Sequence, residues 1–243
     1  MQLTYFGANG WLLELAGQRL LLDPWLVGPL RFGGAGWLFE GTLPREWPIP
    51  SDLDGLLLTQ GLPDHAHPAT LERLPKELPV IGSAAAVQQA RRFGFTQTDT
   101  LRPGERLQRG SLEIQATAGA PVPQVENGYL LDHDAGSLYL EPHGFLDSSL
   151  EPQPLNAVIT PMVDLGLPVV GSFVKGCSVV PQLVERFQPT TVLASTAGGD
   201  VRFNGALSRI LQLHGSPQAT GAALPEGVTW IDPTPGERLL LPN

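Results

Sequence analysis

The residues best suited to chemistry lie in the stretch DGLLLTQGLPDHAHPATLERL, which spans positions 54 to 74. Its apolar run LLLT predicts a buried strand, and PATLERL predicts a helix that begins at the proline. The polar loop between them carries Asp64, His65 and His67. A carboxylate and two imidazoles at the C-terminal end of a strand offer the oxygen and nitrogen ligands that zinc and iron accept. The loop therefore predicts a metal site.

Two positions of the same loop argue against a complete site. Gln60 and Leu62 stand where further ligands would be most useful. The alternative is a purely structural loop, in which Asp64 caps the helix or accepts backbone N–H bonds, and His65 fills space and donates to a carbonyl. His67 directly precedes the helix and is interpreted as a capping or surface residue. Both interpretations of the loop stay open.

A second group of candidate ligands follows the strand in GSLYLEPHG. The period-two pattern of this strand and its proline corner predict that Glu141 and His143 lie on the same side, where Asp147 can join them. The alternative is a corner held by a local hydrogen bond. Two other histidines have simpler explanations. His133 is expected in a solvated hairpin turn, and His214 near the C-terminal end of a predicted helix, where it complements the helix dipole.

The composition limits the class of protein and of partner. A chain of 243 residues with 42% hydrophobic content can bury a sizeable core. The net charge is −9, and Lys76 and Lys175 are the only lysines, so binding to nucleic acid or to an anionic membrane through counterion release is not expected. The single cysteine, Cys177, excludes an internal disulfide and is consistent with a reducing compartment such as the cytoplasm. No run approaches about 18 apolar residues, so neither a transmembrane helix nor a signal peptide is expected.

The 24 prolines and 28 glycines predict many short elements joined by tight turns. Strands predominate, and strand hairpins that alternate with strand-helix units predict a sheet sandwich with helices outside. The segments GQRLLLDPW and GSLYLEPHG share the order glycine, strand, acid and proline, either by coincidence or because one domain, 1–243, has two pseudo-symmetric halves of about 1–125 and 126–243. Hairpin turns are predicted at 16–18, 108–110 and 134–136, and helices at 68–76, 84–94, 179–189 and 203–215.

In this order the elements resemble the metallo-β-lactamase superfamily, specifically its small sugar-lactonase-like metal-dependent hydrolases. LLLDPWLVG resembles the strand-Asp-Pro opening of that branch, and LLLTQGLPDHAHPATLERL its His-x-His-x-Asp-His loop and following helix. GYLLDHDAGSLYLEPHG resembles the hairpin that ends in a Gly-Asp-Thr corner, and TTVLASTAGG falls at the last strand. QGLPDHAHP also resembles a variant motif of cyanobacterial and plastid members. The resemblance implies an α/β fold, an αββα sandwich, with the site along one edge of the sheets.

The same resemblance implies that half of the usual dinuclear site is missing. The first two motif histidines fall on Gln60 and Leu62, whereas Asp64 and His65 are retained. The third ligand histidine falls in GAPVP and the last near residues 195–197, and neither segment contains an imidazole. A leucine and an amide cannot offset the cost of removing water from a divalent cation. The ligands expected for a single zinc, iron or manganese ion are Asp64, His65, Glu141 and His143.

Several segments around this edge could bind a ligand. The glycine-rich loop 23–47 is rich in aromatic residues, which form either an apolar wall over the site or a local core. Lys175 lies in an apolar setting, where it binds a carboxylate or phosphate or extends to solvent. The glycines and hydroxyls of STAGGDV could receive an anion. The aromatic residues of the loop are Trp25, Phe32, Trp37, Phe39 and Trp47.

Two classes of function follow. In the first, the chain is a metal-free descendant that binds a small apolar or carboxylate-bearing ligand, or a partner protein, in the old cleft. In the second, it is an atypical mononuclear metal-dependent hydrolase of the ester, lactone or phosphoester class, with Asp64 and His65 as catalytic residues. A serine triad has no nucleophile-elbow glycines to support it. The residues expected to contact a ligand are Gln60, Trp25, Trp37 and Lys175.

Overall fold

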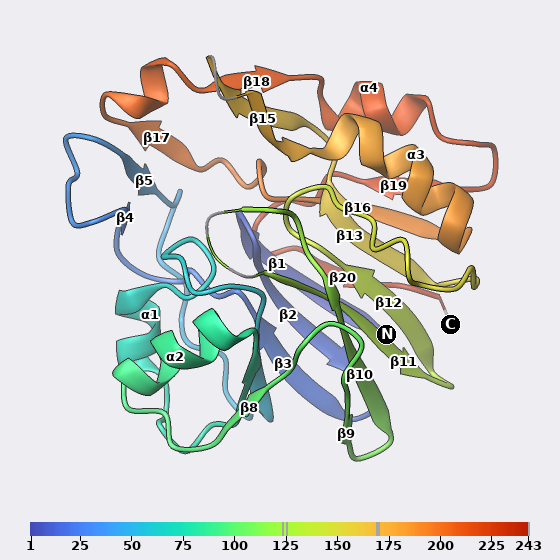
Figure 1. The fold of residues 1–243 in the computed structure, drawn as a ribbon, viewed down its shortest axis with the longest axis horizontal. Coiled ribbons are helices and arrows are strands. Elements are labelled where there is room, and N and C mark those ends of the chain that lie inside the picture. The colour runs from blue at the N-terminus through green and yellow to red at the C-terminus, as the bar shows by residue number, and fades with distance from the viewer. Residues whose placement is uncertain (123, 125, 169–170, 243) are drawn as a thin grey trace.

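The computed structural model describes residues 1–122, 124, 126–168 and 171–242, and shows two seven-stranded sheets packed face to face with helices outside (Figure 1). This αββα sandwich confirms the predicted fold class. Residue 123 of GAPVP and residues 169–170 of PVVGSFVKGCSVV are outside the described residues. The first sheet has the order β20 (Arg238–Leu240), β1 (Gln2–Gly7), β2 (Gly10–Leu15), β3 (Gln18–Leu22), β6 (Gly55–Leu58), β7 (Val80–Gly82) and β8 (Thr98–Thr100).

The second sheet combines an antiparallel half with a parallel half. The antiparallel strands come from consecutive hairpins, and the last three strands run parallel to β12. β9 and β10 precede residue 125 in the chain yet belong to this sheet. The order is β19 (Thr229–Ile231), β16 (Thr191–Ser195), β13 (Ala157–Pro161), β12 (Gly136–Leu140), β11 (Asn127–His133), β10 (Leu112–Ala118) and β9 (Arg106–Arg109).

The hairpin between β2 and β3 turns where the sequence predicted. Ala16 and Gly17 both have positive φ, 55° and 74°, the conformation that lets a two-residue turn follow the twist of its strands. Apolar residues of β1 to β3 alternate between the interface of the two sheets and the outer face of the first sheet. The alternation explains why both faces of these strands are buried.

Within the described residues, four α-helices cover the outer faces. α1 and α2 pack on the first sheet, and α3 and α4 lie beside the second (Figure 1). The His67 side chain accepts a hydrogen bond from the backbone N–H of Thr70, so the predicted capping role of His67 is confirmed. The alternative, a surface position, is wrong, because His67 is buried. The helices are α1 (Pro68–Arg73), α2 (Ala84–Arg92), α3 (Gly176–Phe187) and α4 (Pro217–Ala222).

The helix predicted at 203–215 is wrong. This segment forms β17 (Arg202–Asn204), the 3₁₀-helix η1 (Leu207–Arg209) and β18 (Gln212–His214). Its leucines have helical spacing, but they line a cavity between two small sheets, and Gly205, with φ of 103°, directs the chain away from a continuous helix. His214 therefore lies in a strand, paired with Asp164, and the predicted helix-dipole role of His214 is also wrong.

The two small sheets lie beyond the edge at which the central strands end. One has the order β15 (Gly171–Lys175), β14 (Asp164–Leu167) and β18, and the other β17, β5 (Glu40–Thr42) and β4 (Leu30–Arg31). β17 thus pairs the C-terminal part of the chain with the loop 23–47. In Figure 1 these elements lie above the sandwich. No helix in the described part of the chain is long and apolar enough to cross a membrane.

The corner after β12 packs closely against the start of α3. The carbonyl of His143 accepts a hydrogen bond of 2.9 Å from the N–H of Lys175. Gly144 follows with φ of 72°, and a β-carbon there would lie 2.5 Å from the carbonyl carbon of Lys175. The position of His143 therefore depends on a glycine that allows both the backbone conformation and the contact.

A pair of glycine substitutions tests this contact. Gly104 also has a positive φ, 89°, but a β-carbon there would have no neighbour within 4 Å. Gly104→Ala should lower the free energy of unfolding by about 1–2 kcal/mol through backbone strain alone. Gly144→Ala should cost about 1–3 kcal/mol more, as overpacking does. Urea unfolding measures both values, and equal losses would contradict the close packing of the corner.

Candidate metal centre

A buried pair of Asp23 and His65 forms the base of the site. Asp23 follows β3, and its Oδ2 lies 2.7 Å from Nδ1 of His65 in the loop after β6. Thr59 holds the carboxylate in place, because its N–H and its hydroxyl donate to Oδ1 and Oδ2 at 2.8 and 2.5 Å. A carboxylate on Nδ1 orients the ring and directs Nε2 into the site, which is the usual support of a metal-ligating histidine.

Glu126 and His143 complete a group of three potential ligands. Glu126 lies between β10 and β11, and its Oε2 is 2.5 Å from Nδ1 of His143. The imidazole rings of His65 and His143 are stacked with centroids 5.4 Å apart. One ligand atom from each of the three buried residues lies within 4.8 Å of the other two. The group brings together residues from both sheets.

Unpaired polar atoms surround this group. Among the described residues, three buried side-chain atoms here have no hydrogen-bond partner, and each would cost stability if it stayed unpaired. Two imidazoles and a carboxylate suit zinc, iron or manganese, so the residues present fit one divalent ion. The unpaired atoms are Asn9 Oδ1, Gln60 Oε1 and Asp64 Oδ1.

The loop residues predicted from the sequence lie at this centre. Gln60 is fully buried, and its amide nitrogen donates to Glu126 at 2.7 Å and lies 3.2 Å from Nε2 of His65. Asp64 Oδ2 is also 3.2 Å from Nε2 of His65. Burial alone would lower the pKa of His65, but the carboxylates of Asp64 and Asp23 raise that pKa well above its ordinary value.

Glu141 is placed differently from the other candidates. Its carboxylate accepts hydrogen bonds from the N–H groups of His143 and Phe145, at 3.1 and 2.9 Å, and from the hydroxyl of Thr160. These bonds use the carboxylate to shape the corner that carries His143. The acid beside the two histidines is instead Glu126, which sequence reasoning did not single out. A signal was present, because Glu126 is the only charged residue between Glu113 and Asp132.

The other predicted residues divide between the site and the surface. Trp25 is fully buried beside the centre, whereas Trp37 is 77% exposed. Lys175 is exposed at the start of α3 and does not line the cavity described below. Asp147 accepts from the N–H of Ala118 at 2.8 Å and from Ser149, so it fastens the loop after the corner. The structure thus brings Asp64, His65, His143, Gln60 and Trp25 together and leaves the rest outside.

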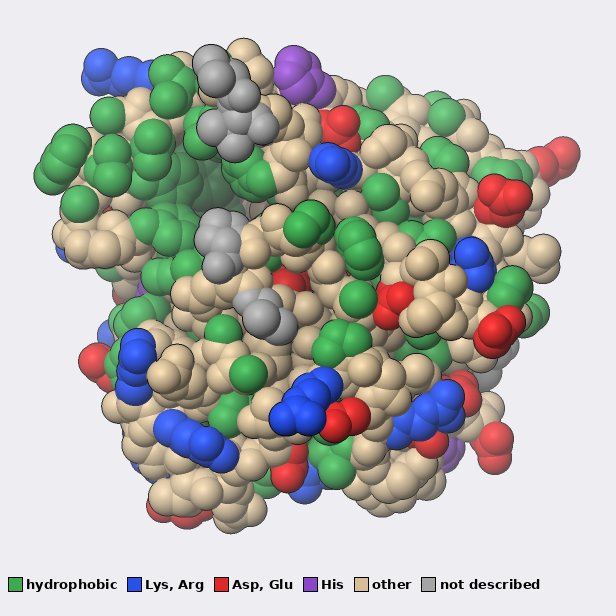
Figure 2. Space-filling model, in the orientation of Figure 1, with side chains coloured by type: hydrophobic (Ala, Val, Ile, Leu, Met, Phe, Trp, Pro, Cys, Tyr) green, Lys and Arg blue, Asp and Glu red, His purple; other side chains and the backbone are tan. Residues whose placement is uncertain are grey.

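An apolar cavity of about 430 Å³ opens over the centre. Its polar lining comes from the ends of the central strands, and its apolar lining from the loop 23–47 and the two small sheets. Figure 2 shows hydrophobic side chains gathered around a hollow in the upper left of the view, where β5, β15 and β17 lie. The polar residues that line the cavity are Asn9, Asp64, His143 and Thr196.

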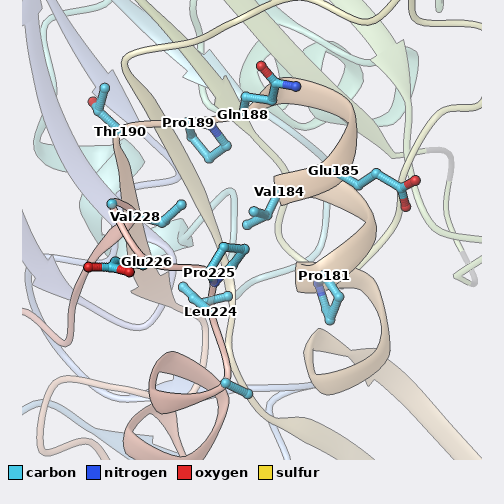
Figure 3. A pocket seen from close by; sticks show the side chains of 12 residues that line it. Pro181, Val184, Glu185, Gln188, Pro189, Thr190, Leu224, Pro225, Glu226 and Val228 are labelled. Atoms are coloured by element: carbon cyan, nitrogen blue, oxygen red, sulfur yellow. The ribbon is translucent and has the colours of Figure 1, made fainter.

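A second, larger groove has no comparable chemistry. It has a volume of about 650 Å³ and lies between α3 and the segment 223–228 (Figure 3). Its two carboxylates, Glu185 and Glu226, point away from one another. Prolines and aliphatic side chains make up most of its remaining lining. The cavity over the histidines is therefore the candidate functional site.

Comparison with known proteins identifies the family. A family model described as a beta-lactamase superfamily domain matches residues 2–195, which include both histidines and Glu126. The chain belongs to the metallo-β-lactamase superfamily. The resemblance seen in the sequence is confirmed at this level. A search of curated proteins gave no match to this chain.

Solved structures with a similar fold cover nearly the whole chain. An isothiocyanate hydrolase from Delia radicum gut bacteria is 16% identical, with a TM-score of 0.72 over 99% of this chain and 98% of its own. A possible metal-dependent hydrolase from Veillonella parvula is also 16% identical, with a TM-score of 0.72 over 98% of each chain. The metallo-β-lactamase fold protein YhfI from Bacillus subtilis is 14% identical, with a TM-score of 0.63 over 98% of this chain and 99% of its own. At these identities the likeness shows the fold.

Glu141 gives a pH-dependent prediction. Burial raises the pKa of its carboxyl group to about 8, although Thr160 and backbone N–H groups oppose this. Because the folded pKa lies above the ordinary value, the folded chain holds the proton more tightly. This contribution to stability is complete below the unfolded pKa and is lost as the pH rises toward 8. Glu141→Gln keeps an acceptor oxygen for the two backbone N–H groups and has no charge, so in metal-free protein it should remove this loss.

Urea unfolding of metal-free wild type and Glu141→Gln between about pH 5 and about pH 9 measures the effect. The variant should lose less free energy of unfolding over this range than the wild type. Glu151→Gln, which changes an exposed carboxyl group, is the matched control and should follow the wild type. Parallel curves for all three proteins would contradict the assigned pKa.

Proposed function

We propose that this chain is a mononuclear metal-dependent hydrolase that acts on a small molecule bound in the apolar cavity. The observation that carries the proposal is the position of His65, Glu126 and His143. Their ligand atoms lie within 4.8 Å of one another, and His143 also lines the cavity. His143 therefore belongs both to the proposed metal centre and to the lining of the cavity that would hold the substrate. We also propose that the chain belongs to the sugar-lactonase-like branch of the superfamily.

A single ion, rather than two, agrees with the residues present. Gln60 and Leu62 replace the first two histidines of the superfamily motif. The Gln60 amide nitrogen donates to Glu126 and faces Nε2 of His65. Asn9 Nδ2 faces the same Nε2 at 3.3 Å. Two amide N–H groups directed at this nitrogen agree with a lone pair there, and that tautomer is the one able to bind a cation.

The residues around the centre have separate roles in the proposed reaction. A bound divalent ion supplies Lewis acidity, which polarises a substrate carbonyl and makes water more acidic. Asp23 orients His65 through Nδ1 and so fixes the direction of Nε2. Asp64 Oδ1 is unpaired, and Asp64 lines the cavity, so its carboxylate can accept a proton from an attacking water. The apolar walls exclude bulk water from the bound substrate.

A metal-free ligand-binding protein is the second candidate. The contact that favours it is Asp64 Oδ2, which lies 3.2 Å from Nε2 of His65 while Asp23 contacts Nδ1. A carboxylate on each ring nitrogen is the arrangement that stabilises a doubly protonated imidazolium. Such a cation binds no metal, and the cavity would then hold a small ligand without hydrolysing it.

Metal content distinguishes the two candidates. Protein purified without chelator or nickel affinity steps should hold about one zinc, iron or manganese ion per chain. His143→Ala and Glu126→Gln should both lose the ion, because each removes one of the three ligands. Elemental analysis by mass spectrometry measures the content. His133→Ala is the matched control, because it removes a histidine from the β11–β12 hairpin and leaves the centre intact.

Circular dichroism and urea unfolding of the same four proteins show that loss of metal is not loss of fold. Retained secondary structure with lost metal in the two site variants supports the centre. The metal centre would be refuted if all four proteins held the same amount of metal, well below one ion per chain. That result would favour the ligand-binding protein.

Asp64→Asn tests the proposed base. With the metal retained, the variant should hydrolyse the neutral ester p-nitrophenyl butyrate with kcat/KM lowered by about 100-fold or more, because the amide cannot accept the proton. Asp134→Asn, in the hairpin turn between β11 and β12, is the control and should match the wild type. Unchanged hydrolysis in Asp64→Asn at equal metal content would exclude Asp64 as the base.

A further inference from the structure

The walls of the cavity define the class of molecule that it can hold. The polar residues Asn9, Asp64, His143 and Thr196 all follow strands of the two central sheets. The remaining lining is apolar, with exposed aliphatic and aromatic surface well above the polar surface. A volume of about 430 Å³ falls within the range of small-molecule sites. The cavity is therefore polar at one end and apolar over the rest.

One wall is a series of aromatic rings. Phe32 and Phe39 meet edge to face with centroids 5.5 Å apart, and Phe39 and Phe203 lie 5.2 Å apart. These contacts join β17 to the loop 23–47, so the wall is built from two distant parts of the chain. Trp25 also lines the cavity, and it donates its indole N–H to the carbonyl of Gly28 at 2.8 Å. Planar rings offer their faces and edges to a ring-containing ligand.

The charges around the cavity select against an anion. Among the lining residues that the structure describes there is no lysine or arginine. Asp64 contributes a carboxylate, and Glu126 lies directly behind His143. Arg31, on the neighbouring strand β4, is paired with Glu40 at 2.6 Å. A carboxylate or phosphate in the apolar part of this cavity would lose its water without gaining a cationic partner, which is costly.

The mouth of the cavity is also apolar. Phe173, Phe203 and Leu213 line the cavity and are 38%, 37% and 58% exposed. Large hydrophobic side chains that reach solvent around an opening mark a ligand-binding site more often than they serve stability. A hydrophobic molecule can therefore contact apolar surface from the opening to the interior.

We infer that the substrate is a neutral, ring-containing apolar molecule whose single hydrolysable polar group lies toward Asp64 and His143. The position of the reactive group rests on the proposed hydrolase function, whereas the neutral apolar class rests on the cavity alone. Ligands with a carboxylate or phosphate in their apolar part are excluded by the same argument.

Two matched fluorescent probes test the class. N-phenyl-1-naphthylamine is neutral, and 1-anilinonaphthalene-8-sulfonate has the same rings with an added sulfonate. Titration of the full chain, followed by probe emission, should give a dissociation constant for the neutral probe that is about tenfold or more below that of the sulfonate, because an unpaired charge is costly to bury.

A pair of substitutions shows where the probes bind. Leu211→Trp fills part of the cavity and should weaken binding of the neutral probe by about tenfold. Leu240→Trp makes the same change at a position that is 81% exposed on β20, and it should leave binding unchanged. Equal binding in both variants, no binding of the neutral probe, or equal affinity for the sulfonate in the cavity would each overturn the inference.

Metal analysis of the same wild-type protein that is titrated with the probes separates this inference from the proposed function. If the centre binds no metal but the neutral probe still binds, the ligand class holds and the hydrolase proposal fails. If the metal is present but the sulfonate binds the cavity as tightly as the neutral probe, the hydrolase proposal holds and the ligand class fails.

Discussion

The buried contact between Asp23 and His65 is the interaction on which the rest of the site depends. It joins the end of β3 to the loop after β6, and these strands are parallel neighbours in the first sheet. Thr59 directs two further donors at the same carboxylate, and Asp23 itself has a φ of 38°, an uncommon conformation for an aspartate. Because a buried charge without its partner costs several kcal/mol, neither residue can be exchanged alone without loss of stability. Because Asp64 directly precedes His65 in the chain, the pair also fixes the position of the loop that carries Asp64.

The second half of the centre is positioned by a different device in the other sheet. β12 ends at Leu140, and the next residue, Glu141, uses its carboxylate to gather two backbone N–H groups and the Thr160 hydroxyl. The resulting corner directs His143 toward Glu126, and Gly144 lets it pack on α3. The centre therefore lies between sheets that are held together by their buried faces. Loss of packing between the sheets would separate His65 from His143 without touching either residue.

Local sequence patterns were sufficient for much of the fold and for half of the centre. The turn at Ala16–Gly17 and the cap at His67 depend on neighbouring residues only, so the sequence indicates them directly. Glu126 escaped notice because its partners, Gln60 and His143, are distant in the chain. The period-two pattern predicted Glu141 as a ligand on the same side as His143, but it could not show that the Glu141 carboxyl group would bond to the backbone of the corner.

In the segment 203–215, contacts with distant parts of the chain also decide the secondary structure, and local sequence patterns do not show them. Three-to-four spacing of apolar residues usually places them on the buried face of a helix. Here Leu207, Leu211 and Leu213 instead face a cavity, and β17 and β18 add to small sheets formed by segments far away in the chain. The long-range pairing partners, not the local spacing, decide the structure of this segment.

Trp37, in the loop 23–47, is exposed although its neighbours Phe32 and Phe39 pack together.

The balance of charge at the centre explains how a site without the usual histidines can persist. Asp23, Asp64 and Glu126 surround two imidazoles, so positive charge is needed to offset the carboxylates. Two sources can supply it at the same nitrogen: a proton on Nε2 of His65, or a divalent ion bound there. Because only one can occupy that lone pair, binding of the ion must release the proton, and metal affinity must fall as the pH is lowered. Gln60 is compatible with either state, because its neutral amide holds Glu126 in place without a charge of its own.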